Sequence, residues 1–129
     1  CMDDHERYEK GMEVRRAVLG DEHVNRSLQN ATDFNRDFQE LLTRYAWGEI
    51  WTRPGLPRHT RSLIVIATLV ALDRPEELRM HIRAAFNNGV TRDDIKEVLL
   101  QSAVYCGLPA ANSAFHAAEE VFAEMSSKK

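Results

Sequence analysis

The chain has 129 residues, of which 43% are hydrophobic and 29% charged, a composition typical of a globular protein, and its length supports one hydrophobic core rather than two. We therefore expect a single domain over residues 1–129. Seventeen basic against twenty acidic residues give a net charge of −3 without any basic run, which argues against nucleic acid as a partner. Because no signal peptide, lipidation motif or membrane-spanning run is visible, we expect a cytoplasmic protein without a membrane partner.

The two cysteines argue against disulfide and thiolate-metal chemistry. Cys1 precedes Met2, and we expect it to be a remnant of cloning because a natural chain normally begins at methionine. Cys106 is then alone, which excludes a disulfide framework and a metal site built from thiolates. The sequence also lacks the His-Glu-x-x-His, P-loop and Gly-x-Gly-x-x-Gly motifs, and we expect no metal ligands.

Three helices are expected in the first part of the chain. Asp3 or Asp4 can cap the first, which runs to about Leu19 and ends at Gly20. A short helical piece covers residues 23–29. The third helix, capped by Thr32 or Asp33, is predicted by apolar residues at three- and four-residue spacing: Phe34, Phe38, Leu41, Leu42, Tyr45 and Ile50.

An irregular loop follows this third helix, whose end at residues 47–51 is aromatic and carries Glu49. Two prolines and a glycine fix the path of the loop, residues 52–58. Arg53 and Arg58 lie on the loop and Arg61 follows it, which suggests an anion site because guanidinium groups present paired donors to a carboxylate. The alternative for each arginine is a solvated surface charge.

Two helices between residues 61 and 91 form the predicted centre of the fold. The first is apolar from Leu63 to Leu72, which is too short to cross a bilayer, so we expect it to be buried. Asp73-Arg74-Pro75 separates it from a second helix, because proline suits a first helical turn. Asn88-Gly89 closes that second helix.

His81 lies at the edge of the apolar face of this second helix, and Glu77 precedes it by one turn. A titratable ring at the border between core and polar surface is a candidate catalytic group. The alternative is a partly buried histidine that Glu77 satisfies. The remaining histidines have no such surroundings in the sequence and are treated as structural or surface residues: His5, His23, His59 and His116.

The last two helices complete an all-helical chain. Thr91 caps one of them, which ends at Gly107, and Gln101 and Tyr105 share one flank of it. Pro109 starts the last helix, which is expected to run to about Met125, with residues 126–129 fraying. No strand pattern is present, so the predicted class is all-α with six or seven helices.

Short segments in a fixed order cover nearly the whole chain. They are Trp51-Thr-Arg-Pro-Gly-Leu56, Arg61-Ser-Leu, Glu77-Leu-Arg-Met-His81, Asn88-Gly89-Val-Thr91, Ile95-Lys-Glu97, Gln101 and Tyr105-Cys-Gly-Leu-Pro109, with the opening Arg7-Tyr8-Glu9-Lys10-Gly11. Together they resemble the 4-carboxymuconolactone decarboxylase family. The resemblance implies an alkylhydroperoxidase D-like helical bundle that forms a homotrimer or homohexamer. It also implies a role in the protocatechuate branch of the β-ketoadipate pathway, with a dicarboxylated lactone as substrate.

The wider superfamily includes thiol peroxidases, whose motif is Cys-x-x-Cys-x-x-x-His preceded by a glutamate. When their histidine is placed on His81, the cysteines fall on Arg74 and Glu77, and the glutamate falls on Ser62. A peroxidase needs a thiolate nucleophile, and Cys106 lies in a different helix. We therefore do not expect thiol peroxidase activity.

The chemistry that the resemblance implies needs no cofactor, because the unsaturated lactone itself accepts the electrons released with CO₂. The protein must hold a dianion, stabilise an oxyanion and donate one proton. On this reading Arg53 and Arg61 bind the two carboxylates. His81 donates the proton or a hydrogen bond to the lactone oxygen, since a histidine carries and releases a proton near neutral pH.

Four further residues have supporting roles on the same reading. Glu77 or Glu49 orients His81, although Glu49 can instead pair with Arg53 one turn later. Gln101 and Tyr105 are additional hydrogen-bond donors, although a tyrosine on a core flank usually serves packing. Two alternatives remain open. The protein could be a decarboxylase or isomerase that acts on a different small carboxylated lactone or keto acid, or it could be a helical oligomer without catalytic activity.

Overall fold

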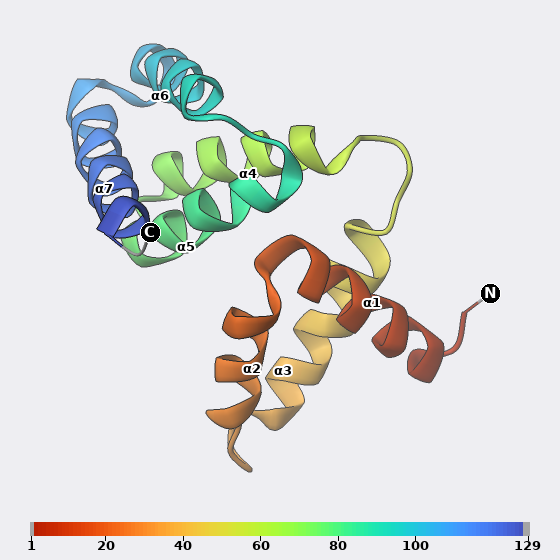
Figure 1. Ribbon diagram of the computed structural model, residues 1–129. Helices are drawn as coiled ribbons and strands as arrows, with labels where there is room; N and C mark the ends of the chain where they lie inside the picture. Colours follow the sequence, from red (N-terminus) through yellow and green to blue (C-terminus); the bar gives the residue numbers. More distant parts are fainter. Residues whose placement is uncertain (1, 128–129) are drawn as a thin grey trace. The chain divides into compact units, whose positions relative to one another are not determined.

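The computed structural model describes residues 2–127, and within them the chain forms seven α-helices, one π-helical segment and one 3-10 turn, without a strand (Figure 1). This confirms the predicted all-α class and helix number. The chain divides into two compact units, residues 2–58 and residues 59–127. That residues 1–129 form a single domain stays a prediction, and Cys1 lies outside the described residues.

The N-terminal unit begins with two helices whose ends are set by local chemistry. Helix α1 spans Asp4–Leu19, and the Asp3 carboxylate caps it by accepting a 2.8 Å hydrogen bond from the Glu6 N–H. Gly20, at φ 93°, separates α1 from α2, Asp21–Gln29. A positive φ is a conformation that glycine adopts without steric cost, so the predicted end of α1 is confirmed. Helix α2 begins two residues before the predicted start at residue 23.

The third helix begins later than predicted. Helix α3 spans Arg36–Leu42, because Thr32 and Asn35 close a turn before it. The Thr32 N–H donates to Asn35 Oδ1 at 2.7 Å, and the Asn35 N–H donates to Thr32 Oγ1 at 3.2 Å. This reciprocal pair is the capping-box pattern, and the Thr32 carbonyl oxygen accepts a 2.9 Å bond from the Arg36 N–H. Thr32 therefore caps the turn that leads into α3, as predicted, while the α-helix itself begins at Arg36.

Helix α3 continues into a π-helix, η1, over Thr43–Ile50. Helix α1 packs closely against η1 at two glycines: a Cβ on Gly11 would overlap the Thr43 carbonyl oxygen, and a Cβ on Gly48 would overlap the Arg7 carbonyl oxygen. Only residues without a side chain fit at these two crossings. Trp47 is buried in the same unit, with its ring centroid 5.1 Å from that of Trp51.

The C-terminal unit is built on the predicted central helix pair. Helix α4 spans Arg58–Leu72 and helix α5 spans Pro75–Ala85, and Figure 1 shows them side by side. Asp73, at φ 55°, makes the reversal between them, as aspartate can in the left-handed region. A 3-10 turn, η2 (Phe86–Asn88), then leads to the left-handed Gly89, which confirms the predicted helix end.

Helices α6 (Arg92–Cys106) and α7 (Leu108–Ser127) close the core of this unit. Thr91 caps α6 as predicted, with a reciprocal pair of bonds to Asp94. Helix α7 starts one residue before Pro109 and continues through Ser127, so the expected fraying from residue 126 is wrong for the described part. The core joins side chains from all four helices: Ile66, Val70, Leu78, Ile82, Ile95, Leu99, Ala114, Ala118 and Val121. Within residues 2–127 no helix is long and apolar enough to cross a bilayer.

Candidate functional site

The predicted site residues are divided between the two units. Glu49 and Arg53 belong to residues 2–58, whereas the other five lie on α4, α5 and α6 of the C-terminal unit: Arg61, Glu77, His81, Gln101 and Tyr105. Arg61 and His81 are half-buried, and the remaining five are exposed.

Arg61 and His81 lie on adjacent helices, beside the buried core. Each directly precedes a fully buried neighbour, Ser62 on α4 and Ile82 on α5. Asn88 Nδ2 donates to Ser62 Oγ at 3.0 Å, which pairs the start of α4 with the end of α5. Arg61 therefore lies in the first turns of α4, and His81 lies on α5, two turns before Asn88.

His59, another histidine of the same unit, contacts a carboxylate, and the sequence analysis did not predict this contact. His59 Nε2 lies 3.0 Å from Asp94 Oδ2, joining the first turn of α4 to the first turn of α6. The prediction that His59 has no functional group around it is wrong, whereas a structural role, which the sequence analysis also allowed, agrees with this contact. The two residues are far apart in sequence and no motif links them, so only the fold brings them together.

Asp94 is held in its ionised form. The Thr91 backbone N–H and then the His59 ring lower the pKa of this carboxyl below its ordinary value, since both hydrogen bonds favour the charged form. A carboxylate with a lowered folded-state pKa stabilises the protein above the unfolded-state pKa of about 4, and this contribution is lost as pH falls through the folded-state value.

We therefore expect Asp94→Asn to lower the urea midpoint of unfolding at pH 7, with a smaller difference from the unmodified protein at pH 3. Urea unfolding followed by circular dichroism at both pH values measures this. Asp93→Asn is the matched control, because Asp93 carries the same charge in the same helical turn and is exposed. Equal midpoints for the Asp94→Asn and Asp93→Asn proteins at pH 7 would show that the tie to His59 does not stabilise the fold.

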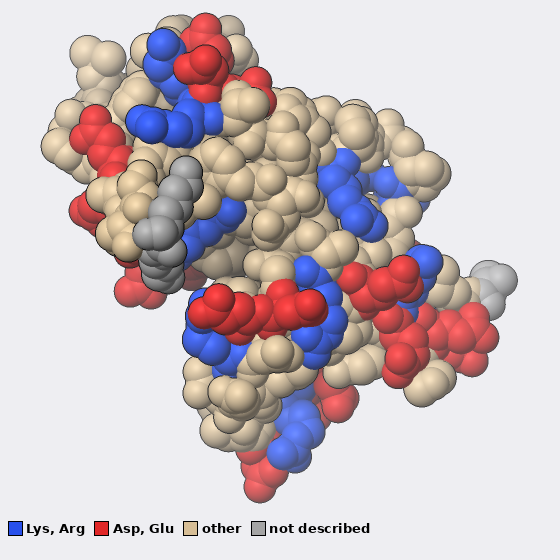
Figure 2. Space-filling model, in the orientation of Figure 1, with Lys and Arg blue, Asp and Glu red and all other residues tan. Residues whose placement is uncertain are grey.

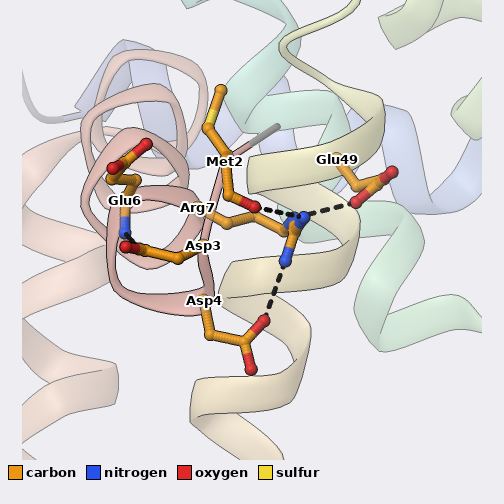
Figure 3. Close-up of polar contacts among 6 residues, drawn as sticks. All are labelled: Met2, Asp3, Asp4, Glu6, Arg7 and Glu49. Carbon is orange, nitrogen blue, oxygen red and sulfur yellow. Dashed lines mark hydrogen bonds and ion pairs between the residues drawn. The ribbon is translucent and has the colours of Figure 1, made fainter.

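Glu49 takes part in an ion pair inside the N-terminal unit (Figure 3). Its Oε2 lies 3.0 Å from Arg7 Nε, and Arg7 also bonds Asp4 Oδ1 at 2.8 Å and the Met2 carbonyl oxygen at 3.0 Å. This network joins α1 to η1. The roles of Glu49 and Glu77 in orienting His81 stay predictions.

Gln101 and Tyr105 are exposed on α6, on a flank of the side that carries its buried residues Ile95, Leu99 and Ser102. Tyr105 is 83% exposed, so it does not pack on a core flank in this structure. Their predicted role as donors to a substrate stays a prediction.

A hollow of about 760 Å³ lies between η2, α6 and α7 of the C-terminal unit. Its walls include three phenylalanines and Arg92, whose guanidinium carbon lies 4.6 Å from the Phe122 ring centroid. None of the seven predicted site residues lines it. No sequence pattern predicts this hollow, because its walls come from three separate parts of the chain: η2, the first half of α6 and the middle of α7.

Comparison with known proteins identifies the family of this chain. Residues 36–120, more than half of the chain, match the model of the Carboxymuconolactone decarboxylase family. This chain belongs to the carboxymuconolactone decarboxylase family. The match runs from the start of α3 to residue 120 within α7. It includes the seven predicted site residues: Glu49, Arg53, Arg61, Glu77, His81, Gln101 and Tyr105.

Similarity to individual proteins agrees with this assignment. The chain is 62% identical over 124 residues to the 4-carboxymuconolactone decarboxylase of Acinetobacter baylyi, covering 96% of this chain and 92% of that protein. It is 43% identical over 121 residues to nitrosuccinic acid decarboxylase npaB of Metarhizium robertsii, covering 94% of this chain and 85% of the relative. A 4-carboxymuconolactone decarboxylase sequence of Pseudomonas putida is 58% identical over 48 residues, which is 37% of this chain and all of that sequence.

Charge is evenly mixed on the visible surface of this family member. Figure 2 shows basic side chains scattered among acidic and uncharged residues rather than gathered into a continuous band. Among residues 2–127 no group of three or more His, Cys, Asp or Glu side chains is placed to hold a metal ion. The absence of nucleic-acid, membrane, metal and cofactor partners stays a prediction.

Proposed function

We propose that this chain decarboxylates 4-carboxymuconolactone to 3-oxoadipate enol-lactone and CO₂ without a cofactor, in the protocatechuate branch of the β-ketoadipate pathway. The observation that carries the proposal is the 62% identity to a 4-carboxymuconolactone decarboxylase over nearly the full length of both chains. On the central helix pair, the half-buried Arg61 supplies a positive charge and the half-buried His81 a hydrogen-bonding ring, which are groups that a dianionic substrate requires. A cytoplasmic location suits this step of aromatic-acid degradation and is part of the proposal.

The reaction balances without an added electron acceptor. The carbon γ to the lactone carbonyl carries both a carboxylate and an acetate arm. When the bond to the carboxylate breaks, its electron pair moves through the ring double bond to the carbonyl oxygen, giving a 2-oxyfuran anion. A proton then adds to the carbon next to the carbonyl. The protein needs to place the substrate, stabilise the oxyanion and deliver that proton.

Within this proposal Arg61 and Arg53 bind the two carboxylates, and His81 delivers the proton or donates to the lactone oxygen. The arginines must not stabilise the departing carboxylate more than the transition state, because uniform binding lowers KM without raising kcat. Glu49 and Glu77 as orienting groups, and Gln101 and Tyr105 as further donors, complete the proposed site.

The relative from Metarhizium favours a second candidate substrate. Nitrosuccinic acid and 4-carboxymuconolactone share a succinate skeleton, in which the carbon that loses CO₂ carries a –CH₂–carboxylate arm and an electron-withdrawing group. The nitro group replaces the unsaturated lactone as the acceptor of the electron pair. A site that recognises the succinate part therefore suits either compound, and the electron-accepting half decides between them.

The proposal is tested by adding the purified protein to 4-carboxymuconolactone generated in situ, with EDTA present, and following CO₂ and enol-lactone formation. We expect turnover well above the spontaneous rate, unchanged by the chelator. A parallel assay offers nitrosuccinate. Turnover of nitrosuccinate alone would reassign the substrate, and no turnover of either compound by the folded protein would leave the fold assignment intact and remove the proposed function.

A further inference from the structure

The hollow between η2, α6 and α7 has the size and the floor of a small-molecule site, and no step of the proposed reaction uses it. Its volume of about 760 Å³ lies within the range of about 300–1,000 Å³ that such sites occupy. The side chains of its floor belong to the core and are at most 3% exposed: Val90, Ile95, Leu99 and Ala118. Because core packing holds these side chains, the floor keeps its shape whatever the hollow contains.

The walls of the hollow are aromatic. Phe86, Phe115 and Phe122 stand partly buried around it. The rings of Phe86 and Phe122 meet edge to face, with centroids 6.1 Å apart and an interplanar angle of 72°. Aromatic rings form offset and edge-on contacts of this kind with further rings. The walls therefore suit a flat, unsaturated ligand better than a branched aliphatic one.

Two cations on the α6 side of the hollow have no carboxylate partner. Within residues 2–127 neither Arg92 nor Lys96 makes an ion pair or a side-chain hydrogen bond. Lys96 follows Arg92 by four residues, so the two side chains share one face of α6. The Arg92 guanidinium carbon lies 4.6 Å from the Phe122 ring centroid. A guanidinium stacked on a ring keeps its N–H donors at its edge, where a carboxylate can accept them, so the hollow can bind an anion beside an aromatic wall.

The acidic side chains of the lining limit the charge of that anion. Asp93 and Glu119 also border the hollow, so its two cations and two carboxylates sum to zero. One carboxylate on a ligand pairs with Arg92 and Lys96, whereas a second one would add a like charge to a lining that already contains Asp93 and Glu119. The lining therefore favours a single negative charge, unlike the dianionic substrate proposed above.

We propose that this hollow is a binding site for a small aromatic monocarboxylate, with its ring among the three phenylalanines and its carboxylate on Arg92 and Lys96. None of the seven predicted site residues lines the hollow, so the site is separate from the proposed catalytic groups. The hollow is larger than a single ring, so a fused two-ring acid fills it better than benzoate does. The inference does not depend on which substrate the protein takes.

Isothermal titration calorimetry of the full chain with benzoate, 2-naphthoate and isophthalate tests the ligand class. We expect benzoate to bind with a dissociation constant on the order of 0.1–1 mM, as for a ligand of so few atoms. 2-Naphthoate is expected to bind about tenfold more tightly, because its second ring buries further apolar surface. Isophthalate carries a second carboxylate and is expected to bind more weakly than benzoate. No binding of benzoate and 2-naphthoate, or tightest binding of isophthalate, would overturn the proposed ligand class.

Three variants test the position of the ligand. Arg92→Gln is expected to weaken 2-naphthoate binding at least about tenfold, because it removes a charge-assisted bond to the carboxylate. Its fold should be intact because Arg92 is exposed. Arg74→Gln is the matched control, since Arg74 is an exposed arginine of the same unit that does not border the hollow, and it is expected to leave the dissociation constant unchanged.

The third variant, Arg61→Gln, tests the proposed catalytic site as the alternative position, and 2-naphthoate is expected to bind it as it binds the unmodified protein. Binding that Arg61→Gln abolishes and Arg92→Gln leaves intact would place the ligand at the catalytic groups and overturn this proposal. Equal dissociation constants for the Arg92→Gln and Arg74→Gln proteins would also overturn it, because Arg92 would then take no part in binding.

Discussion

The variant His81→Ala is expected to lose about 10²–10⁴ in kcat for decarboxylation, with its fold intact. A positioned general acid contributes about that factor, and an oxyanion donor about 10²–10³, so either proposed role of His81 gives a loss in this range. The fold should survive because His81 is half-buried at the edge of the core, while Leu78 and Ile82 are the side chains by which α5 packs into the core. Steady-state kinetics and circular dichroism measure the two quantities.

Two comparisons separate chemistry from structure. His116→Ala is the control for removal of an imidazole, because His116 lies exposed on α7. His81→Gln keeps a hydrogen-bond donor without a titratable proton. A loss for His81→Ala that His81→Gln largely restores would assign His81 to the lactone oxygen, whereas equal losses would assign it to proton delivery. An unchanged kcat for His81→Ala would remove this residue from the mechanism.

Helix boundaries were predictable from the sequence where their chemistry is local. Asp3 and Thr91 cap α1 and α6 through bonds to residues three positions away, and Gly89 ends the central pair in the left-handed conformation. Each signal lies within four residues of the boundary that it sets. Thr32 makes the same kind of reciprocal bond pair with Asn35, three positions later, at the turn that leads into α3.

The sequence did not predict features that depend on what lies opposite a residue. Apolar periodicity predicted the helix that carries Phe38 and Leu41, but periodicity cannot tell whether a core or solvent faces that side. The π-helix over Thr43–Ile50 also has no periodic signature. Its wider turns accompany the close approach of Gly11 to the Thr43 carbonyl, a tertiary contact across more than thirty residues.

The candidate site was predicted through family resemblance rather than through geometry. Periodicity places His81 at the border of an apolar face, and the structure finds it half-buried there. Its role comes from the resemblance, as do the roles of Arg53 and Arg61. The tie between His59 and Asp94 shows the limit of both approaches, because neither a motif nor a periodic pattern joins the two residues.

The second large effect is expected at the crossing of α1 and η1, where Gly11→Ala should lower the free energy of unfolding by about 1–3 kcal/mol. In an ordinary helix interior, alanine is favoured over glycine by about 1 kcal/mol, so an open position would be stabilised. At Gly11 the added Cβ would overlap the Thr43 carbonyl oxygen and approach within 2.9 Å of the Gly48 backbone nitrogen. Both groups are backbone atoms of η1, so relief requires the helices to separate, and overpacking of this kind costs about 1–3 kcal/mol or more.

Urea unfolding at pH 7 measures the expected loss, and Gly55→Ala supplies the matched control. A Cβ at Gly55 would meet nothing within 4 Å, so that variant should stay within about 0.5 kcal/mol of the unmodified protein. Because helix propensity alone predicts stabilisation by Gly11→Ala, the sign of the change decides between propensity and packing. A Gly11→Ala protein more stable than the unmodified chain would show that α1 and η1 are not held at this close approach in solution.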